Sequence, residues 1–325
     1  MQLYYGDIPL CYTHSVAMVL HGYGYGYGYG YGYDFQPPYL EALMAMGNGA
    51  NFLNDDPRHP LVFFDNGEPD ISISNCLQML GFEYDEHYLK PSDEMDVVNI
   101  KESLASLLKN GPVIVGPLDM GHLTYNPNHG YLKGVDHFVT IYDLIGDELF
   151  LHDPAGYPCM QMNFTDFLPA WQAESIVYKR GSFSMWGNLR RVETPSPAEI
   201  YHKLSLTMKE RYESGQSNVI EAYADSIRSH GLNLQQKQLH DFFSFRLASV
   251  RSNYLSHFLL KHDLERAVLK EKMADLFGQA HLASLREDYT SLADILQDIA
   301  QLDNQFKEKC LQYKAEEDIK SDSKK

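Results

Sequence analysis

No proline follows Pro197 in this 325-residue chain. Proline interrupts helices, so a long stretch without it permits several uninterrupted ones. Apolar residues in this stretch recur at the three- and four-residue spacing of a helix face, as in Ile220, Tyr223, Ala224 and Ile227, and in Leu285, Tyr289, Leu292, Leu296, Ile299, Leu302 and Phe306. The sequence therefore predicts an all-α helical domain over residues 199–315, followed by a disordered polar tail over 316–325.

The first half of the chain has a different pattern, and residues 193–198 separate the two. That segment holds Pro195 and Pro197 and no apolar run, which is typical of a linker. Before it, the patterns predict short helices and then β-branched strands, with helices over 11–21, 74–80 and 100–109 and strands over 112–118, 137–146, 148–154, 174–180 and 184–192. Helices followed by antiparallel strands indicate an α+β domain over residues 1–192.

Acidic residues outnumber basic ones by 44 to 27, which gives a formal net charge of −17. Such a chain repels nucleic acid and anionic membranes, so neither is an expected partner, and it attracts small cations. The charge also fits an acidic protein kept soluble, with no further role. The first residues resemble no signal peptide, and the four cysteines form no CxxC pair. We therefore expect a cytoplasmic protein with reduced thiols.

Three residues form a candidate catalytic set. Cys11 stands where a helix is predicted to begin, and unpaired N–H groups at a helix N-terminus favour a thiolate and can hold an oxyanion. His137 begins one predicted strand and Asp153 ends the next, with a hairpin turn at Gly146-Asp147. This arrangement places an imidazole beside a carboxylate at one end of the hairpin. A thiol, a base and an acceptor that orients the base are the parts of nucleophilic catalysis.

The segments CYTHSVAMVLHGYGY and DHFVTIYDLIGDELFLHDP, with a helical second half, resemble the butirosin biosynthesis protein H family. Members are papain-like acyltransferases, distantly similar to bacteriocin-processing cysteine peptidases. The resemblance implies a papain-like first domain. It also implies antibiotic biosynthesis, with an acyl group passing from a thioester donor, an acyl carrier protein or a CoA-type thioester, through Cys11 to an amine acceptor, including a polycationic one. In that pattern His137 is the base and Asp153 orients it.

The chain departs from the papain-like pattern before the nucleophile. A glutamine usually stands about six residues before the cysteine and donates to the oxyanion, but Tyr5 occupies that place and the nearest glutamine is Gln2. The oxyanion donors expected here are therefore the backbone of Cys11, with Gln2 or Tyr5. A carrier protein is itself acidic, so its docking requires a local basic patch, for which the candidates are Lys179, Arg180, Arg190 and Arg191.

Other interpretations remain open. Cys11 also fits a packed core cysteine, Cys76 is a rival nucleophile at another predicted helix, and Cys159 and Cys310 are expected to be structural or surface thiols. The Gly-Tyr tract from Gly22 to Tyr33 fits either a surface loop or an aromatic lid. No cofactor motif is present, and His122, His129, Asp136 and His137 match no metal-ligand spacing, so neither a metal nor a cofactor is expected. A cysteine peptidase or amidase, and a non-catalytic binding or scaffold protein, are the alternative functions.

Overall fold

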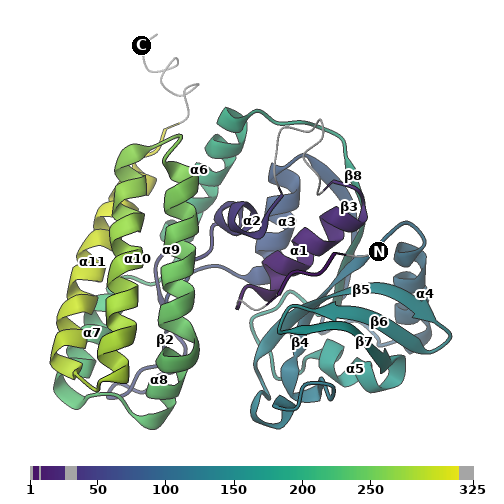
Figure 1. The fold of residues 1–325 in the computed structure, drawn as a ribbon, viewed down its shortest axis with the longest axis horizontal. Coiled ribbons are helices and arrows are strands. Elements are labelled where there is room, and N and C mark those ends of the chain that lie inside the picture. The colour runs from purple at the N-terminus through teal and green to yellow at the C-terminus, as the bar shows by residue number, and fades with distance from the viewer. Residues whose placement is uncertain (1–2, 7–8, 26–34, 315–325) are drawn as a thin grey trace. The chain divides into compact units, whose positions relative to one another are not determined.

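The computed structural model describes residues 3–6, 9–25 and 35–314, and it divides the chain into two compact units (Figure 1). The first comprises Met1–Leu40 and Glu68–Pro195, and the second comprises Glu41–Gly67 and Ser196–Lys325. The boundary between Pro195 and Ser196 lies within the segment 193–198, for which the sequence predicts a linker. The predicted continuous domain over 1–192 is interrupted, because residues 41–67 pack with the helical unit. The predicted tail at 316–325 lies outside the described residues.

The first unit contains a six-stranded antiparallel sheet in the order β3-β8-β4-β5-β6-β7. Its elements in chain order are α1 (Cys11–Gly22), α3 (Pro69–Met79), β3 (Phe82–Leu89), α4 (Val97–Leu108), β4 (Val113–Asp119), the 3₁₀ turns η1 (Met120–His122) and η2 (His129–Tyr131), β5 (Asp136–Ile145), β6 (Glu148–Asp153), β7 (Tyr157–Asn163), α5 (Phe164–Gln172) and β8 (Ser182–Arg191). Helix α2 (Pro37–Leu43) spans the boundary between the units.

Alternate residues of β5 serve the two faces of this sheet, as the period of a strand requires. Val139 and Ile141 enter the main core cluster, to which α4 and α5 contribute their apolar faces. Phe138 and Thr140 instead meet α1, which lies on the other side of the sheet (Figure 1). Helix α1 is therefore buried along almost its whole length, from Tyr12 to His21.

The predicted strand over 174–180 is wrong: this segment is an irregular loop between α5 and β8. Side chains, not a backbone ladder, hold it in place. The Nζ of Lys179 donates to the carbonyl oxygens of Gln172 and Ala173 at the end of α5, and the guanidinium of Arg180 forms ion pairs with Asp70 and Glu86. Val177, two residues before Lys179, is 88% exposed, so its β-branched character does not reflect burial in a sheet.

The second unit consists mainly of helices after Ser196, as the absence of proline after Pro197 predicts. Its elements are α6 (Pro197–Ser214), α7 (Val219–His230), α8 (Leu234–Leu239), the π-helical turn η3 (His240–Ser244), α9 (Phe245–Leu259), α10 (Leu264–Leu285), α11 (Tyr289–Leu311) and a small pair of strands, β1 (Asn51–Phe52) and β2 (Val62–Phe63). Helix α6 begins at a capping box in which Ser196 and Glu199 satisfy each other's backbone N–H groups. No helix in the described residues is long and apolar enough to cross a membrane.

Residues 41–67 belong to the helical unit because their apolar and charged side chains are buried there. Val62 and Phe64 join the core formed by α7, α9, α10 and α11. Arg251 of α9 forms ion pairs with Glu41, at 2.9 Å, and with Asp65, at 2.7 Å, and all three side chains are buried. A buried guanidinium between two carboxylates fixes this segment to its helices.

Candidate active site

Cys11 is the first residue of α1 and is partly exposed, whereas the next ten residues of the helix are buried. Leu10 precedes it at the N-cap and provides no side-chain cap. The first N–H groups of the helix therefore have no side-chain acceptor from the cap, and they point toward the end where the thiol lies. The positive end of the helix dipole favours negative charge at this position.

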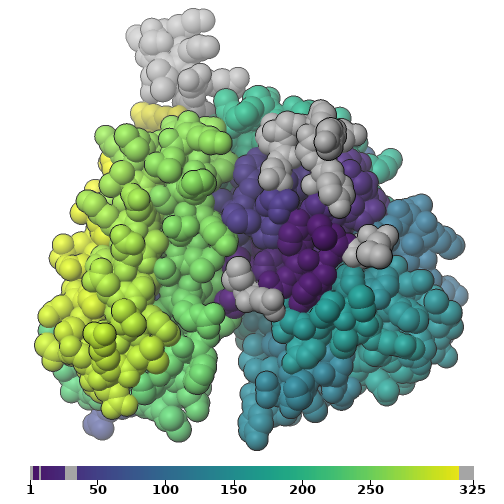
Figure 2. Space-filling view, in the orientation of Figure 1, coloured from purple at the N-terminus to yellow at the C-terminus, as the bar shows by residue number. Residues whose placement is uncertain are grey.

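Two contacts align α1 with β5. The ring of Tyr12 meets that of Phe138 edge to face, with centroids 6.0 Å apart, and the hydroxyl of Thr140 donates to the carbonyl oxygen of Ser15 at 3.2 Å. One residue earlier on each element stand Cys11 and His137, and Cys11 lies close enough to the imidazole to raise the pKa of His137. In the space-filling view the purple N-terminal atoms adjoin the teal strands directly (Figure 2).

Asp153 is the second partner of His137. Nε2 of the imidazole donates to Oδ1 of Asp153 at 2.5 Å, and both side chains are buried. Because Nε2 is used in this way, Nδ1 is the ring nitrogen that remains for the thiol of Cys11. The structure thus brings together Cys11, His137 and Asp153, although their catalytic role stays a prediction.

The register of the hairpin differs from the simple one assumed for the sequence. His152 lies opposite Thr140 and Leu151 opposite Ile141, and a bulge follows between Ile141 and Asp143. His137 and Asp153 are therefore diagonal neighbours and not directly opposite, and the long imidazole spans the difference.

Further groups hold the Asp153 carboxylate. The hydroxyl of Tyr125 donates to Oδ2 at 2.9 Å, and the N–H of Ala155 donates to Oδ1 at 2.6 Å. Burial raises the pKa of Asp153, but the charge of His137 and these hydrogen bonds outweigh burial, so its pKa lies below the ordinary value. Asp153 is accordingly ionised at neutral pH.

The pKa of His137 moves in the opposite direction. Burial lowers it, but the charges of Asp153 and Cys11 and the hydrogen bond to Asp153 dominate, so the net pKa lies well above 6.5. A protonated imidazole between a carboxylate and a thiol stabilises the thiolate. The arrangement can thus supply a nucleophilic sulfur and a proton donor beside it.

Sequence reasoning missed several tyrosines around this set. Tyr125 lies in the loop between β4 and β5, where no periodicity gives a signal. The hydroxyl of Tyr4 donates to the carbonyl oxygen of Asp153 at 3.1 Å, and that of Tyr178 donates to Oδ1 of Asp136 at 2.8 Å. Asp136 directly precedes His137, whereas Tyr178 lies in the irregular loop before β8, where the sequence carries no signal.

The expected oxyanion donors are only partly described. Gln2 lies outside the described residues. The hydroxyl of Tyr5 donates to Oε1 of Gln36 at 3.0 Å and lies 2.8 Å from Nε2 of His21. The backbone of Cys11 at the start of α1 remains the candidate that the geometry favours.

The four residues expected to dock a carrier protein each have a partner within the first unit. Lys179 and Arg180 fix the loop before β8, as described above. Arg190 pairs with Glu83 at 3.0 Å on the surface, and the guanidinium of Arg191 lies over the rings of Phe35 and Phe82. Carrier docking by these residues stays a prediction. The side chains of Arg190 and Glu83 are both widely exposed, whereas those of Arg180 and Glu86 are largely covered.

The other cysteines have different surroundings. Cys76 and Cys310 are buried, and Cys159 is exposed on β7. The thiol of Cys76 lies 4.0 Å from the carbonyl oxygen of Leu40. Within the described part of the chain, no three His, Cys, Asp or Glu side chains are grouped to hold a metal ion.

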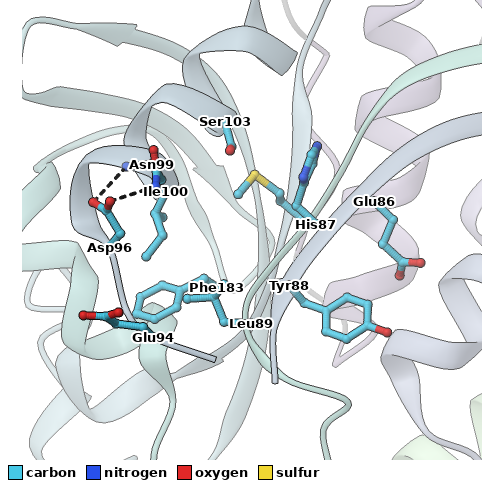
Figure 3. A pocket seen from close by; sticks show the side chains of 11 residues that line it. Glu86, His87, Tyr88, Leu89, Glu94, Asp96, Asn99, Ile100, Ser103 and Phe183 are labelled. Atoms are coloured by element: carbon cyan, nitrogen blue, oxygen red, sulfur yellow. Dashed lines mark hydrogen bonds between the residues drawn. The ribbon is translucent and has the colours of Figure 1, made fainter. Parts of the chain in front are cut away.

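A hollow of about 290 Å³ opens among β3, α4 and β8, and Cys11 and His137 are not part of its lining (Figure 3). Two of its carboxylates serve the fold. Asp96 caps α4 by accepting from the N–H groups of Val98 and Asn99, and Glu86 pairs with Arg180.

The fold and the site define a two-unit protein of mixed α and β structure, with an antiparallel sheet, a helical C-terminal region, and a thiol, an imidazole and a carboxylate in series. A model of the YobF C-terminal domain matches residues 211–311, from the end of α6 through α11. Over 316 residues the chain is 31% identical to the uncharacterized protein YobF of Bacillus subtilis (strain 168), and the match covers 94% of this chain and 97% of that protein. The chain belongs to the YobF family.

Proposed function

We propose that the protein is a cysteine-dependent acyltransferase with a papain-like first unit. The observation that carries this proposal is the series Cys11, His137 and Asp153, in which the imidazole is hydrogen-bonded to Asp153 and Cys11 lies close enough to raise its pKa. The raised pKa of His137 and the lowered pKa of Asp153 fit an imidazolium that stabilises a thiolate. The sequence resemblance to butirosin biosynthesis protein H supports transfer to an amine over hydrolysis.

The reaction has two steps. In the first, the Cys11 thiolate attacks the carbonyl carbon of a donor thioester, the bond from that carbon to the donor sulfur breaks, and His137 protonates the departing thiol. N–H groups at the start of α1 hold the oxyanion. In the second, an amine attacks the Cys11 thioester, His137 takes up a proton, and the Cys11 sulfur leaves as thiolate. Exchange between thioesters is nearly balanced in energy, and amide formation drives the sequence forward.

Product analysis tests this function. The full chain is mixed with a small acyl thioester and a diamine, and the amide, the carboxylic acid and the released thiol are quantified for wild type and Cys11→Ser. We expect the amide to exceed the acid for wild type, with both at background for the variant. Release of acid alone, or cleavage of peptides without a thioester donor, would instead assign hydrolysis.

A further inference from the structure

Two aspartates lie opposite each other next to His137. Asp119 ends β4 and Asp136 begins β5, and they are paired in the sheet register. Asp119 is buried. Its Oδ1 accepts from the N–H groups of Gly121 and Gly134, at 2.8 and 2.9 Å, and its Oδ2 accepts from the hydroxyl of Ser175. One carboxylate thus fixes both ends of the loop between β4 and β5, and also the loop before β8.

Asp136 also fixes the loop before β8. Its Oδ1 accepts from the hydroxyl of Tyr178, three residues after Ser175. Tyr178 is held on both sides. Ser175 before it donates to Asp119, and Lys179 and Arg180 anchor the chain after it. The tyrosine nonetheless keeps 44% of its surface exposed. A side chain that is restrained but accessible is suited to contact a substrate, because little of its freedom remains to be lost on binding.

This pair adjoins His137, because Asp136 directly precedes it, and Tyr178 is close enough to Cys11 for the charge of the thiol to act on the phenol. Burial raises the pKa of Tyr178, and the negative charges of Asp136 and Cys11 raise it further, so the phenol stays protonated and its hydrogen remains committed to Asp136. What the pair offers a ligand is therefore the lone pairs of the phenol oxygen and the negative charge of the carboxylate. These groups repel an oxyanion or a carboxylate and attract an N–H donor that carries positive charge.

We propose that Asp136 and Tyr178 bind the protonated amine of the acceptor beside the Cys11 thioester. This inference rests on the proposed function and specifies its second substrate as a cationic primary amine. The bound ammonium gives one proton to neutral His137 and, on forming the amide, a second proton to solvent, and the Cys11–carbonyl bond breaks to restore the thiolate. The net charge of −17 adds a long-range attraction for such a substrate.

The test compares two nucleophiles on one acyl-enzyme. Wild type, Asp136→Asn and Tyr178→Phe are acylated with a small thioester, and discharge by putrescine, a dication at pH 7, and by hydroxylamine, which is neutral there, is followed by intact mass. We expect Asp136→Asn to lower the second-order rate for putrescine about tenfold relative to that for hydroxylamine, and Tyr178→Phe to lower it several-fold. Tyr131→Phe, which removes the hydroxyl of a 92% exposed tyrosine, is the matched control and should change neither rate.

The ratio of the two rates distinguishes this role from others. A general loss of reactivity at His137 slows both nucleophiles alike and leaves the ratio unchanged, which would overturn the inference. So would an acyl-enzyme that hydroxylamine discharges and putrescine does not. If wild type forms no acyl-enzyme with any thioester, the proposed function itself fails and this inference falls with it.

Discussion

Asp153 governs the charge of the candidate site, because it is the ionised neighbour of His137. It is fully buried, and its carboxylate accepts hydrogen bonds from His137, Tyr125 and the backbone of Ala155. An amide in its place keeps much of the shape and loses the negative charge that holds the proton on the imidazole.

Asp153→Asn should therefore lower acyl transfer about a hundredfold or more, by analogy with triads whose acid is replaced by an amide. Without the carboxylate the pKa of His137 falls, so the decline of activity at alkaline pH should move to lower pH. A profile of the acylation rate against pH measures both effects. Asp143→Asn, on the exposed part of β5, is the matched control; an equal loss there, or an unmoved profile for Asp153→Asn, would contradict the assigned role.

The same pair links stability to pH. The pKa of His137 is higher in the folded than in the unfolded chain. Its contribution to the free energy of unfolding is therefore complete below about pH 6.5 and is lost as the pH rises through the folded pKa. The pKa of Asp153 is lower when folded, so its contribution is complete above about 3.8 and is lost as pH falls through the folded value. The difference in unfolding free energy between wild type and a His137→Gln, Asp153→Asn double variant should thus be largest between these limits. Denaturant titrations across the range measure it, and a difference independent of pH would refute the linkage.

The hairpin of β5 and β6 is the element that brings His137 and Asp153 together. Ile145 pairs with Glu148, so Gly146 and Asp147 form a two-residue turn, as the sequence predicted. Gly146 has a φ of +63°, and no atom lies within 4 Å of the place where a Cβ would be. Any cost of a side chain there is therefore one of backbone conformation alone.

Gly146→Ala should destabilise the protein by about 1 kcal/mol, because alanine disfavours positive φ. Gly130→Ala is the matched control: its Cβ would also meet no atom, but Gly130 has no positive φ, so that change should be neutral or slightly stabilising. Midpoints of denaturant unfolding compare the two. Equal effects would mean that the turn does not impose the strain described.

The elements that the sequence predicted are those with strong local signals. The hairpin turn, the start of α1 at Cys11 and the helices after Ser196 each follow from periodicity, glycine or a capping residue. The strand predicted over 174–180 is wrong because the prediction considered only the residue types of the segment. In the structure Arg180 holds this loop through Glu86, far away in the chain, and Lys179 holds it through the end of α5. For the same reason Tyr125 and Tyr178 could not be placed beside the site: loop positions carry no period.

At the scale of the whole molecule, no local sequence pattern indicates that residues 41–67 belong to the second unit. Their membership of the second depends on contacts between residues far apart in the chain, above all those of Arg251 with Glu41 and Asp65. Burial raises the pKa of Asp65, and the charge of Arg251 opposes that rise. The guanidinium therefore favours the charged form of this buried carboxylate.

Arg251→Met should destabilise the protein by about 3 kcal/mol or more at neutral pH, because it leaves two buried carboxylates without their cation. The loss should shrink at lower pH, where those carboxylates take up protons. Arg228→Met removes an exposed ion pair with Asp294 and should cost no more than about 1 kcal/mol. Unfolding free energies of the two variants decide the matter, and similar losses in both would argue against the proposed clamp.

The central claim is that Cys11 is the nucleophile, and the four cysteines allow a direct comparison within one chain. Cys159 is the more exposed thiol, so a reagent guided by access alone would modify it first. The decisive measurement is the site of acylation after brief exposure of the native protein to less than one equivalent of an acyl thioester, read by intact mass and peptide mapping. We predict a single acyl group on Cys11, absent from Cys11→Ala. Acylation of Cys159 ahead of Cys11, or the same adduct on Cys11→Ala, would contradict the claim.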